Sequence, residues 1–279
     1  MSPQELRAAV ERLAAMADPP RDAALPVVAA LLDALERGEI RAVEPREGGF
    51  RAHAWIKQGI LLGFRVGTNV EIHVPPVFQF RDRDTFPTRD LPSSRPEVRV
   101  VPGGTTVRRG AYLGAGVVVM PPAFINVGAW VGESTLVDSH VLVGSCAQVG
   151  ARVHLSAAAQ VGGVLEPVGS LPVVIEDDVF VGGGCGVYEG TWVRAGAVLA
   201  AGVVLTRSVP VYDLVRQSMH RAPPGGPLVI PERAVIVPGA RPAAGEFAER
   251  HGVQLQAPVI VKYRDASSDA ASALEEALR

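Results

Sequence analysis

Residues 113–161 read LGAGVVVMPPAFINVGAWVGESTLVDSHVLVGSCAQVGARVHLSAAAQV, and this stretch repeats every six residues. Every sixth residue from Leu113 to Val161 is Leu, Ile or Val, and a second block with the same period runs from Ile175 to Leu205. The residue four places later is usually small or β-branched, and glycine often follows the branched residue directly. Self-similarity at a fixed period indicates a repeat architecture.

A period of six excludes an ordinary α-helix, whose side chains repeat every 3.6 residues, and is unusual for a twisted sheet. A triangular solenoid satisfies the period, because each hexamer then forms one short strand and one corner. The branched residue points into the prism, the small residue fits beneath the turn, and glycine relieves the corner. Three hexamers make a coil of about 18 residues, stacked on the next at about 4.8 Å. The sequence therefore predicts a mainly β protein built around a parallel β-helix.

The repeat is interrupted once, between Val161 and Ile175, where the step is fourteen residues. We interpret residues 162–174 as a loop that projects from a corner. Loops on a rigid scaffold often carry ligand contacts, but a tolerated insertion would leave the same pattern.

The segments on either side of the repeat have different patterns. Residues 1–66 carry apolar residues at helical spacing, with a hairpin-like stretch at 40–50, and residues 67–98 read as a linker or surface loop. Beyond Leu205 we expect strands at 229–230, 234–237 and 258–264 and a helix in the last twelve residues. These features predict a mostly α-helical N-terminal domain with a linker (1–98), the β-helix (99–210) and a short C-terminal β/α cap (211–279) over its open strand edges.

Composition narrows the classes of partner and compartment. The 27 basic and 29 acidic residues give a formal charge of −2 and form no basic cluster, so we expect neither nucleic acid nor membrane as a partner. The N-terminal sixteen residues lack the apolar core of a signal peptide, which predicts a cytoplasmic protein. The two cysteines have no CxxC spacing, so we expect no disulfide framework and no metal site.

Several runs of sequence carry a resemblance to a known family. They are ALLDALERGEIRAVE (30–44), HAWIKQGILLGFR (53–65), RVVPGGTTVRRGAYLG (99–114), MPPAFINVGAWVGESTLVD (120–138), VGSCAQVGARVHLS (143–156), GGVLEPVGSLPVVIEDDVFVG (162–182), VYEG (187–190) and APVIVKYR (257–264). Together they closely resemble the tetrahydrodipicolinate N-succinyltransferases of the diaminopimelate–lysine pathway, a hexapeptide-repeat transferase family. The resemblance implies a left-handed β-helix, although parallel crossovers are generally right-handed. The related N-acetyltransferases usually lack the Ser-Cys-Ala-Gln run, which favours a succinyl donor over an acetyl donor.

The resemblance also implies a reaction and its residues. The acceptor, a dicarboxylate in its opened 2-amino-6-oxopimelate form, would attack the thioester of succinyl-CoA, a co-substrate, with no permanently bound cofactor. Such a transfer needs a base, a cation for the carboxylates and donors for the thioester oxyanion. Asp138 matches the family's catalytic and substrate-binding aspartate, Glu189 its second acidic residue, and Arg99 its substrate-binding arginine, a guanidinium suited to a carboxylate. From the residues alone, a turn cap, a solvated carboxylate and an edge arginine remain open alternatives.

The phase of the repeat separates the two acidic residues. Counted from Leu113, Asp138 and Glu189 fall on different faces of one prism, so we expect a homotrimer in which neighbouring subunits share each active site. Which carboxylate is the base, and which residues contact CoA, stay open.

Other residues support competing interpretations. His140 or His154 would serve a histidine-dependent O-acetyltransferase, although a structural role is expected for each, and an inactive scaffold is a third possibility. Cys146 and Cys185 read as packed corner residues. Arg108 and Arg109 are expected to be solvated, with attraction of CoA phosphates as the alternative, and the family's frequent polar residues are missing at Cys185-Gly186.

Overall fold

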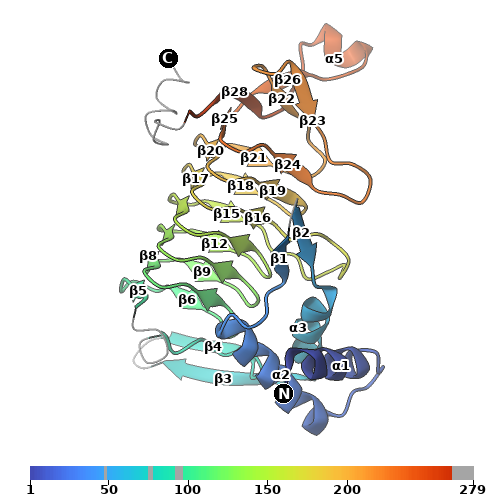
Figure 1. Cartoon of the computed structure of the whole chain (residues 1–279), viewed down its shortest axis with the longest axis vertical. Coiled ribbons are helices and arrows are strands. Elements are labelled where there is room, and N and C mark those ends of the chain that lie inside the picture. Colours follow the sequence, from blue (N-terminus) through green and yellow to red (C-terminus); the bar gives the residue numbers. More distant parts are fainter. Residues whose placement is uncertain (47–48, 75–77, 92–96, 266–279) are drawn as a thin grey trace.

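A computed structural model of the chain describes residues 1–46, 49–74, 78–91 and 97–265. The middle of the chain winds into a three-sided solenoid of very short strands, with the N-terminal helices at one end and a β cap at the other (Figure 1). Sheet I contains β7 (Tyr112–Leu113), β10 (Trp130–Val131), β13 (Gln148–Val149), β16 (Val174–Ile175), β19 (Thr191–Val193) and β24 (Leu228–Ile230). Sheet II contains β5 (Arg99–Val100), β8 (Val118–Val119), β11 (Leu136–Val137), β14 (His154–Leu155), β17 (Phe180–Val181) and β20 (Val198–Leu199). Sheet III contains β6 (Thr106–Val107), β9 (Phe124–Ile125), β12 (Leu142–Val143), β15 (Gln160–Val161), β18 (Gly186–Val187) and β21 (Val204–Leu205).

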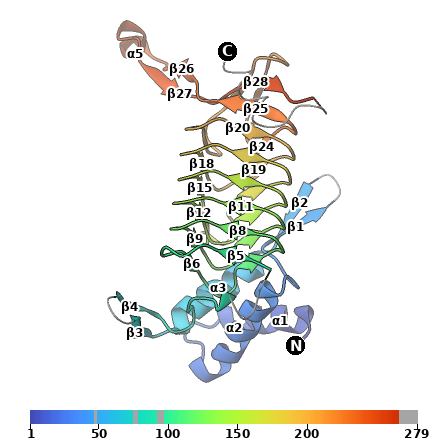
Figure 2. The same ribbon diagram turned by 90° about the vertical axis from the view of Figure 1, so that its left-hand side faces the viewer.

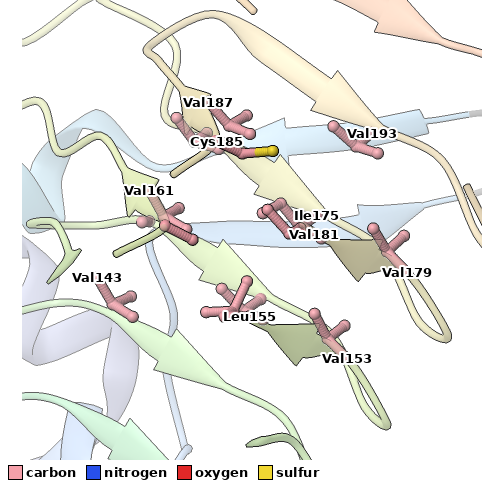
Figure 3. Packing of buried hydrophobic residues seen from close by; sticks show 14 of the residues in the cluster. Val143, Val153, Leu155, Val161, Ile175, Val179, Val181, Cys185, Val187 and Val193 are labelled. Atoms are coloured by element: carbon pink, nitrogen blue, oxygen red, sulfur yellow. The ribbon is translucent and has the colours of Figure 1, made fainter. Parts of the chain in front are cut away.

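The six-residue period is confirmed as one strand and one corner per repeat. The chain passes from sheet I to II to III and back, and each strand pairs in parallel with the strand one coil away, as Val131 does with Val149. In nearly every strand the second residue is fully buried, and inward residues from the three sheets point toward the axis, as Leu155, Val161 and Ile175 show in Figure 3. Because parallel pairing keeps the register, branched side chains stack directly on one another through the prism.

The glycines that follow the branched residues have a different role from the predicted relief of corner strain. A Cβ added to Gly144 would lie 2.1 Å from the backbone nitrogen of Gly163 in the next coil. The left-handed backbone falls two residues later, and side-chain residues such as His140 (φ 63°) adopt it as well as glycines. At the position of Gly144, glycine is therefore required because successive coils approach closely, and not because the backbone is left-handed.

The interruption at 162–174 adds eight residues to one corner. Val149 pairs with Ile175, 26 residues on, whereas Val131 and Val149 are 18 apart. The chain leaves sheet III at Val161 and re-enters in sheet I, so the insertion replaces a single corner and the order of the sheets is preserved. We call residues 162–173 the insertion loop.

The N-terminal helices form as their sequence predicts and pack on the solenoid. They are α1 (Pro3–Ala14), α2 (Arg21–Glu36) and α3 (Ala54–Val66), with β1 (Val43–Arg46) and β2 (Gly49–Ala52) forming an antiparallel hairpin between α2 and α3. Ser2 starts α1 with a reciprocal capping box to Glu5. The apolar core of the helices includes Val127 and Cys146, so these helices cover the lower corners between sheets III and I.

The expectation of a linker at 67–98 was wrong for its first half. Strands β3 (Asn69–Val74) and β4 (Phe78–Arg83) pair along their whole length as an antiparallel hairpin. The alternation in this segment is obscured by its charges, and its Asp82 binds Arg108 of the solenoid at 2.6 Å. Because Asp82 and Arg108 lie far apart in the sequence, their ion pair leaves no periodic pattern from which the hairpin could be predicted.

The predicted C-terminal strands are confirmed, and they continue the sheets. β24 extends sheet I, while β25 (Ala234–Val237), β28 (Val259–Tyr263), β22 (Val211–Asp213) and β23 (Ser218–His220) extend sheet II. β26 (Ala240–Pro242), β27 (Gln254–Gln256) and α5 (Glu246–Arg250) form an arm that projects from this end (Figure 2). The helix expected over the last twelve residues lies outside the described residues. Within the described part of the chain, no helix has the length and apolar character needed to cross a bilayer.

Candidate functional site

Asp138 lies at the corner between sheets II and III. Its backbone N–H donates to the oxygen of Leu155, and one carboxylate oxygen accepts the N–H of Ser139 at 2.7 Å. The local turn cap considered from the sequence is therefore present. The side chain is half-buried at this corner.

Arg99 lies on the same sheet as the strand that precedes Asp138. It pairs with Val118, which pairs in turn with Leu136, so Arg99 is two strands from the Asp138 corner. Two strand spacings amount to about 9.6 Å. The residue is exposed. A dicarboxylate of several carbons can span such a distance between a guanidinium and an acidic corner.

Glu189 lies at the corner between sheets III and I, in a cleft of 490 Å³ that we call the Glu189 cleft. The insertion loop forms one wall of the cleft with Pro167 and residues 169–171, and residues 206–208 and Gly225 form the other. Arg207 is held in place because its guanidinium donates to the oxygens of Gly226 at 2.8 Å and Pro223 at 3.2 Å. The cleft thus contains a carboxylate and a guanidinium on a fixed backbone.

The structure does not bring Asp138 and Glu189 together in one subunit. Asp138 follows β11 of sheet II, whereas Glu189 follows β18 of sheet III, so the two corners border sheet III on opposite edges. The separation predicted from the phase of the repeat is confirmed. One prism carries the two carboxylates at separate corners.

Comparisons with known proteins agree with this architecture. A family model described as the N-terminal part of tetrahydrodipicolinate N-succinyltransferase matches residues 3–66, and one described as the hexapeptide repeat of succinyl-transferase matches residues 172–207. The 2,3,4,5-tetrahydropyridine-2,6-dicarboxylate N-succinyltransferase of Aromatoleum aromaticum is 40% identical over 259 residues, which cover 90% of this chain and 88% of the relative. The chain belongs to the tetrahydrodipicolinate N-succinyltransferase family. The N-succinyltransferase of Idiomarina loihiensis is 39% identical over 89% of the chain and 87% of that relative.

A solved structure from Campylobacter jejuni, provisionally named as a 2,3,4,5-tetrahydropyridine-2-carboxylate N-succinyltransferase, is 13% identical. The likeness covers 91% of this chain and 64% of that one, with a TM-score of 0.46.

The two candidate histidines, His140 and His154, are at least partly exposed, whereas both cysteines are buried. His140 is exposed two residues after Asp138, and the His154 ring packs against Phe180 at 5.0 Å. Both cysteines are buried, and burial raises the pKa of Cys146 to about 12 and that of Cys185 to about 11. The predicted packing role of the cysteines is confirmed, since a neutral buried thiol is a poor nucleophile.

Neither expectation for Arg108 and Arg109 was right. Arg108 binds Asp82 of the β3–β4 hairpin, and Arg109 binds Asp33 and Glu36 of α2, the latter at 2.7 Å. Both arginines fasten the N-terminal elements to the solenoid. Their charges are already paired, which removes the basis for a phosphate site there.

A second cleft, of 570 Å³, lies between the β1–β2 hairpin and sheet I. Arg41 stacks 4.1 Å from the centre of the Trp130 ring and donates to Gln148, and burial lowers the pKa of its guanidinium to about 10. Glu176 and Arg194 pair in the wall at 2.7 Å. This cleft could not be predicted from the sequence, because its two sides lie far apart along the chain. Among the described residues, no three His, Cys, Asp or Glu are grouped to hold a metal ion.

Sequence reasoning also missed most of the Glu189 cleft. Ser170, Leu171 and Arg207 line it beside Glu189. Ser170 and Leu171 belong to the run at 162–182 that resembles the family, but no role was expected for them, and Arg207 lies outside every such run. The one available signal was the interruption of the repeat. It placed a loop of unknown purpose next to an acidic residue one coil later.

Proposed function

We propose that this enzyme transfers the succinyl group of succinyl-CoA to the amino group of tetrahydrodipicolinate in its opened form, as a step of diaminopimelate and lysine synthesis. Membership of the family carries the proposal, because relatives named as N-succinyltransferases share up to about 40% of their residues with this chain along nearly its whole length. We also propose that the solenoid is left-handed and that the protein is cytoplasmic. Asp138 and Glu189 are proposed as the catalytic residues. Arg99 binds one carboxylate of the acceptor.

The positions of Asp138 and Glu189 on opposite edges of sheet III support a homotrimer. When sheet III of each prism faces a threefold axis, the II/III corner of one subunit lies beside the III/I corner of its neighbour. Asp138 of one subunit and Glu189 of the next then border the same interface, displaced by two coils along the solenoid. Sheet III presents apolar outward residues suited to such burial, with Phe124 38% exposed in the single chain and Leu142 and Val204 half-buried.

The opposite corner supports the same orientation of the prism. Between sheets I and II the corners are strongly charged: Arg152 binds Asp178 at 2.7 Å, and Arg194 binds Glu176 and Glu232. Exposed ion pairs of this kind add little stability but are well hydrated. A charged ridge belongs on the solvent side of an oligomer, which leaves sheet III for the axis.

The reaction proposed is a direct transfer between two bound substrates. The amine attacks the thioester carbonyl, the new C–N bond forms, the C–S bond breaks, and the amine proton passes to a carboxylate and on to the leaving CoA thiolate. Asp138 and Glu189 are the acid–base groups available at the shared cleft. Backbone N–H groups at the stacked corners are the candidate donors to the oxyanion.

Release of CoA thiol tests the proposal. The purified enzyme is assayed with succinyl-CoA or acetyl-CoA against 2-aminopimelate and against a sugar acceptor, and light scattering gives its mass. We expect turnover with succinyl-CoA and the amino dicarboxylate, and the mass of three chains. Absence of turnover with any dicarboxylate amine contradicts the proposal, and sugar acetylation that requires His140 or His154 would replace it with an O-acetyltransferase.

A further inference from the structure

Lys57 is a buried cation outside the predicted site. It lies on α3, is 2% exposed, and donates its ammonium to the backbone oxygen of Ser170 in the insertion loop at 2.5 Å. Burial lowers the pKa of this ammonium. Lysine is among the residues least often found fully buried, because its charge loses hydration that the protein must replace.

The loop that receives this hydrogen bond is bonded directly to the Glu189 corner. Leu171, the next residue after Ser170, accepts the backbone N–H of Gly190 at 2.8 Å. The oxygen of Gly190 accepts in turn from the N–H of Leu228 at 2.7 Å. Gly190 is therefore held from both sides, and Glu189 precedes it by one residue.

Among the residues that the structure describes, one other titratable group acts on Lys57, the buried thiol of Cys146 at the III/I corner. That thiol is neutral near pH 7, since burial raises its pKa to about 12. The ammonium consequently has a main-chain carbonyl as its polar partner. A hydrogen bond from a charged donor is stronger than one between neutral groups, which suits it to hold a loop.

We propose that Lys57 is a positioning residue, which fixes the insertion loop so that the loop holds the Glu189 corner in its working geometry. The effect on catalysis rests on the function proposed above. The N-terminal domain then acts on the active site from behind the cleft wall, without touching substrate. A plain tether between α3 and the solenoid would stabilise the fold and leave the Glu189 corner unchanged.

The test compares Lys57→Met with Arg65→Met. Methionine keeps the apolar stem of Lys57 and removes the ammonium. Arg65 lies on the same helix and also donates to backbone carbonyls, those of Leu13 and Ala14. Its side chain borders a groove with Glu166 and Val168 of the loop, but these hydrogen bonds go to the end of α1, so its substitution is a control for losing a cation that does not fasten the loop. Hydrogen exchange is measured for segments 165–175 and 186–193 and, as reference, for 115–125, together with kcat and KM for both substrates.

We expect Lys57→Met to raise exchange in the first two segments by about tenfold or more while the reference segment and the oligomeric mass stay unchanged. A displaced catalytic group costs up to about 100-fold, so kcat falls by about 10- to 100-fold while KM for the acceptor stays within about threefold. Arg65→Met leaves all these values near those of the wild type. Unchanged exchange at both segments, or equal loosening of the whole chain, overturns the proposal.

Two further outcomes are informative. If Lys57→Met does not fold, Lys57→Arg keeps a cation of different length, and we expect a smaller increase in exchange in the same two segments; no change there overturns the proposal. If wild-type enzyme shows no succinyl transfer but Lys57→Met loosens only these segments, the link from Lys57 to Glu189 stands and the proposed function fails.

Discussion

Asp138 and Glu189 lie on opposite edges of sheet III, Asp138 after β11 of sheet II and Glu189 after β18 of sheet III. The six-residue period sets this relationship, because a shift of one repeat moves a residue to the next corner. Any reaction that needs both carboxylates needs two subunits.

Mixed trimers test whether the site is shared. Asp138→Asn and Glu189→Gln are each expected to be nearly inactive alone, since every interface then lacks one carboxylate. When the two variants are co-expressed in equal amounts, about one quarter of interfaces receive both native residues, so activity returns to about one quarter of the wild-type value. CoA release by the purified mixture measures it. A mixture as inactive as its parents would show that the two residues do not meet across an interface.

The stability of the solenoid is expected to depend on its axial residues. Leu155 is fully buried on the axis, so Leu155→Ala leaves a cavity and lowers the free energy of unfolding by about 3 kcal/mol. Leu214, 64% exposed in the cap, is the matched control, and Leu214→Ala changes it by less than about 0.5 kcal/mol. Urea unfolding followed by circular dichroism gives both values. Similar losses for the two variants would contradict the packing described here for the axis.

The repeat and the phase of the two acidic residues were predictable because both depend on local periodicity. Val143 and Leu155 point inward wherever the six-residue step holds, and Asp138 follows an inward Val137 by one place. The pairing of Arg108 with Asp82, and that of Lys57 with Ser170, depend on how distant segments dock. Such contacts are set by tertiary packing and leave no local pattern. The residues that form the walls of the Glu189 cleft could therefore not be predicted from the sequence.

Alanine variants of two glycines with left-handed backbones allow the effect of backbone strain to be distinguished from the effect of steric crowding. Gly190 has φ +71°, and a Cβ there would lie 2.8 Å from Cδ of Arg207 in the Glu189 cleft; Gly184 has φ +66° and open space. Both alanine variants are expected to lose about 1 kcal/mol of stability from the backbone alone. Gly190→Ala also displaces Arg207, so the kcat/KM of this variant falls below that of Gly184→Ala by about tenfold or more. Thermal unfolding and steady-state kinetics measure the two effects. Equal kinetics for the two variants would argue against a precise placement of the Glu189 cleft.

Asp213 predicts an acid-sensitive cap. It is 2% exposed and accepts hydrogen bonds from the Tyr263 hydroxyl at 2.6 Å, from the backbone N–H groups of Val215 and Arg216, and from His220 at 3.3 Å. Burial opposes the charge, but these bonds together hold the pKa of Asp213 below its ordinary value. Burial, followed by the bond to Asp213, raises the pKa of Tyr263 to about 12.

A carboxyl with a depressed pKa stabilises the folded state above the pKa of the unfolded chain, about 3.9, and this stability is lost as the pH falls through the folded value. Asp213→Asn is expected to lose about 2 kcal/mol at pH 7, because hydrogen bonds to a charged group contribute 1.5–3 kcal/mol. Between pH 5 and 3 the wild type loses stability more steeply than the variant, so the two urea midpoints converge. Tyr263→Phe, which removes one donor and keeps the carboxylate, gives a smaller loss at pH 7. Parallel pH profiles for wild type and Asp213→Asn would show that Asp213 is not linked to the acid transition.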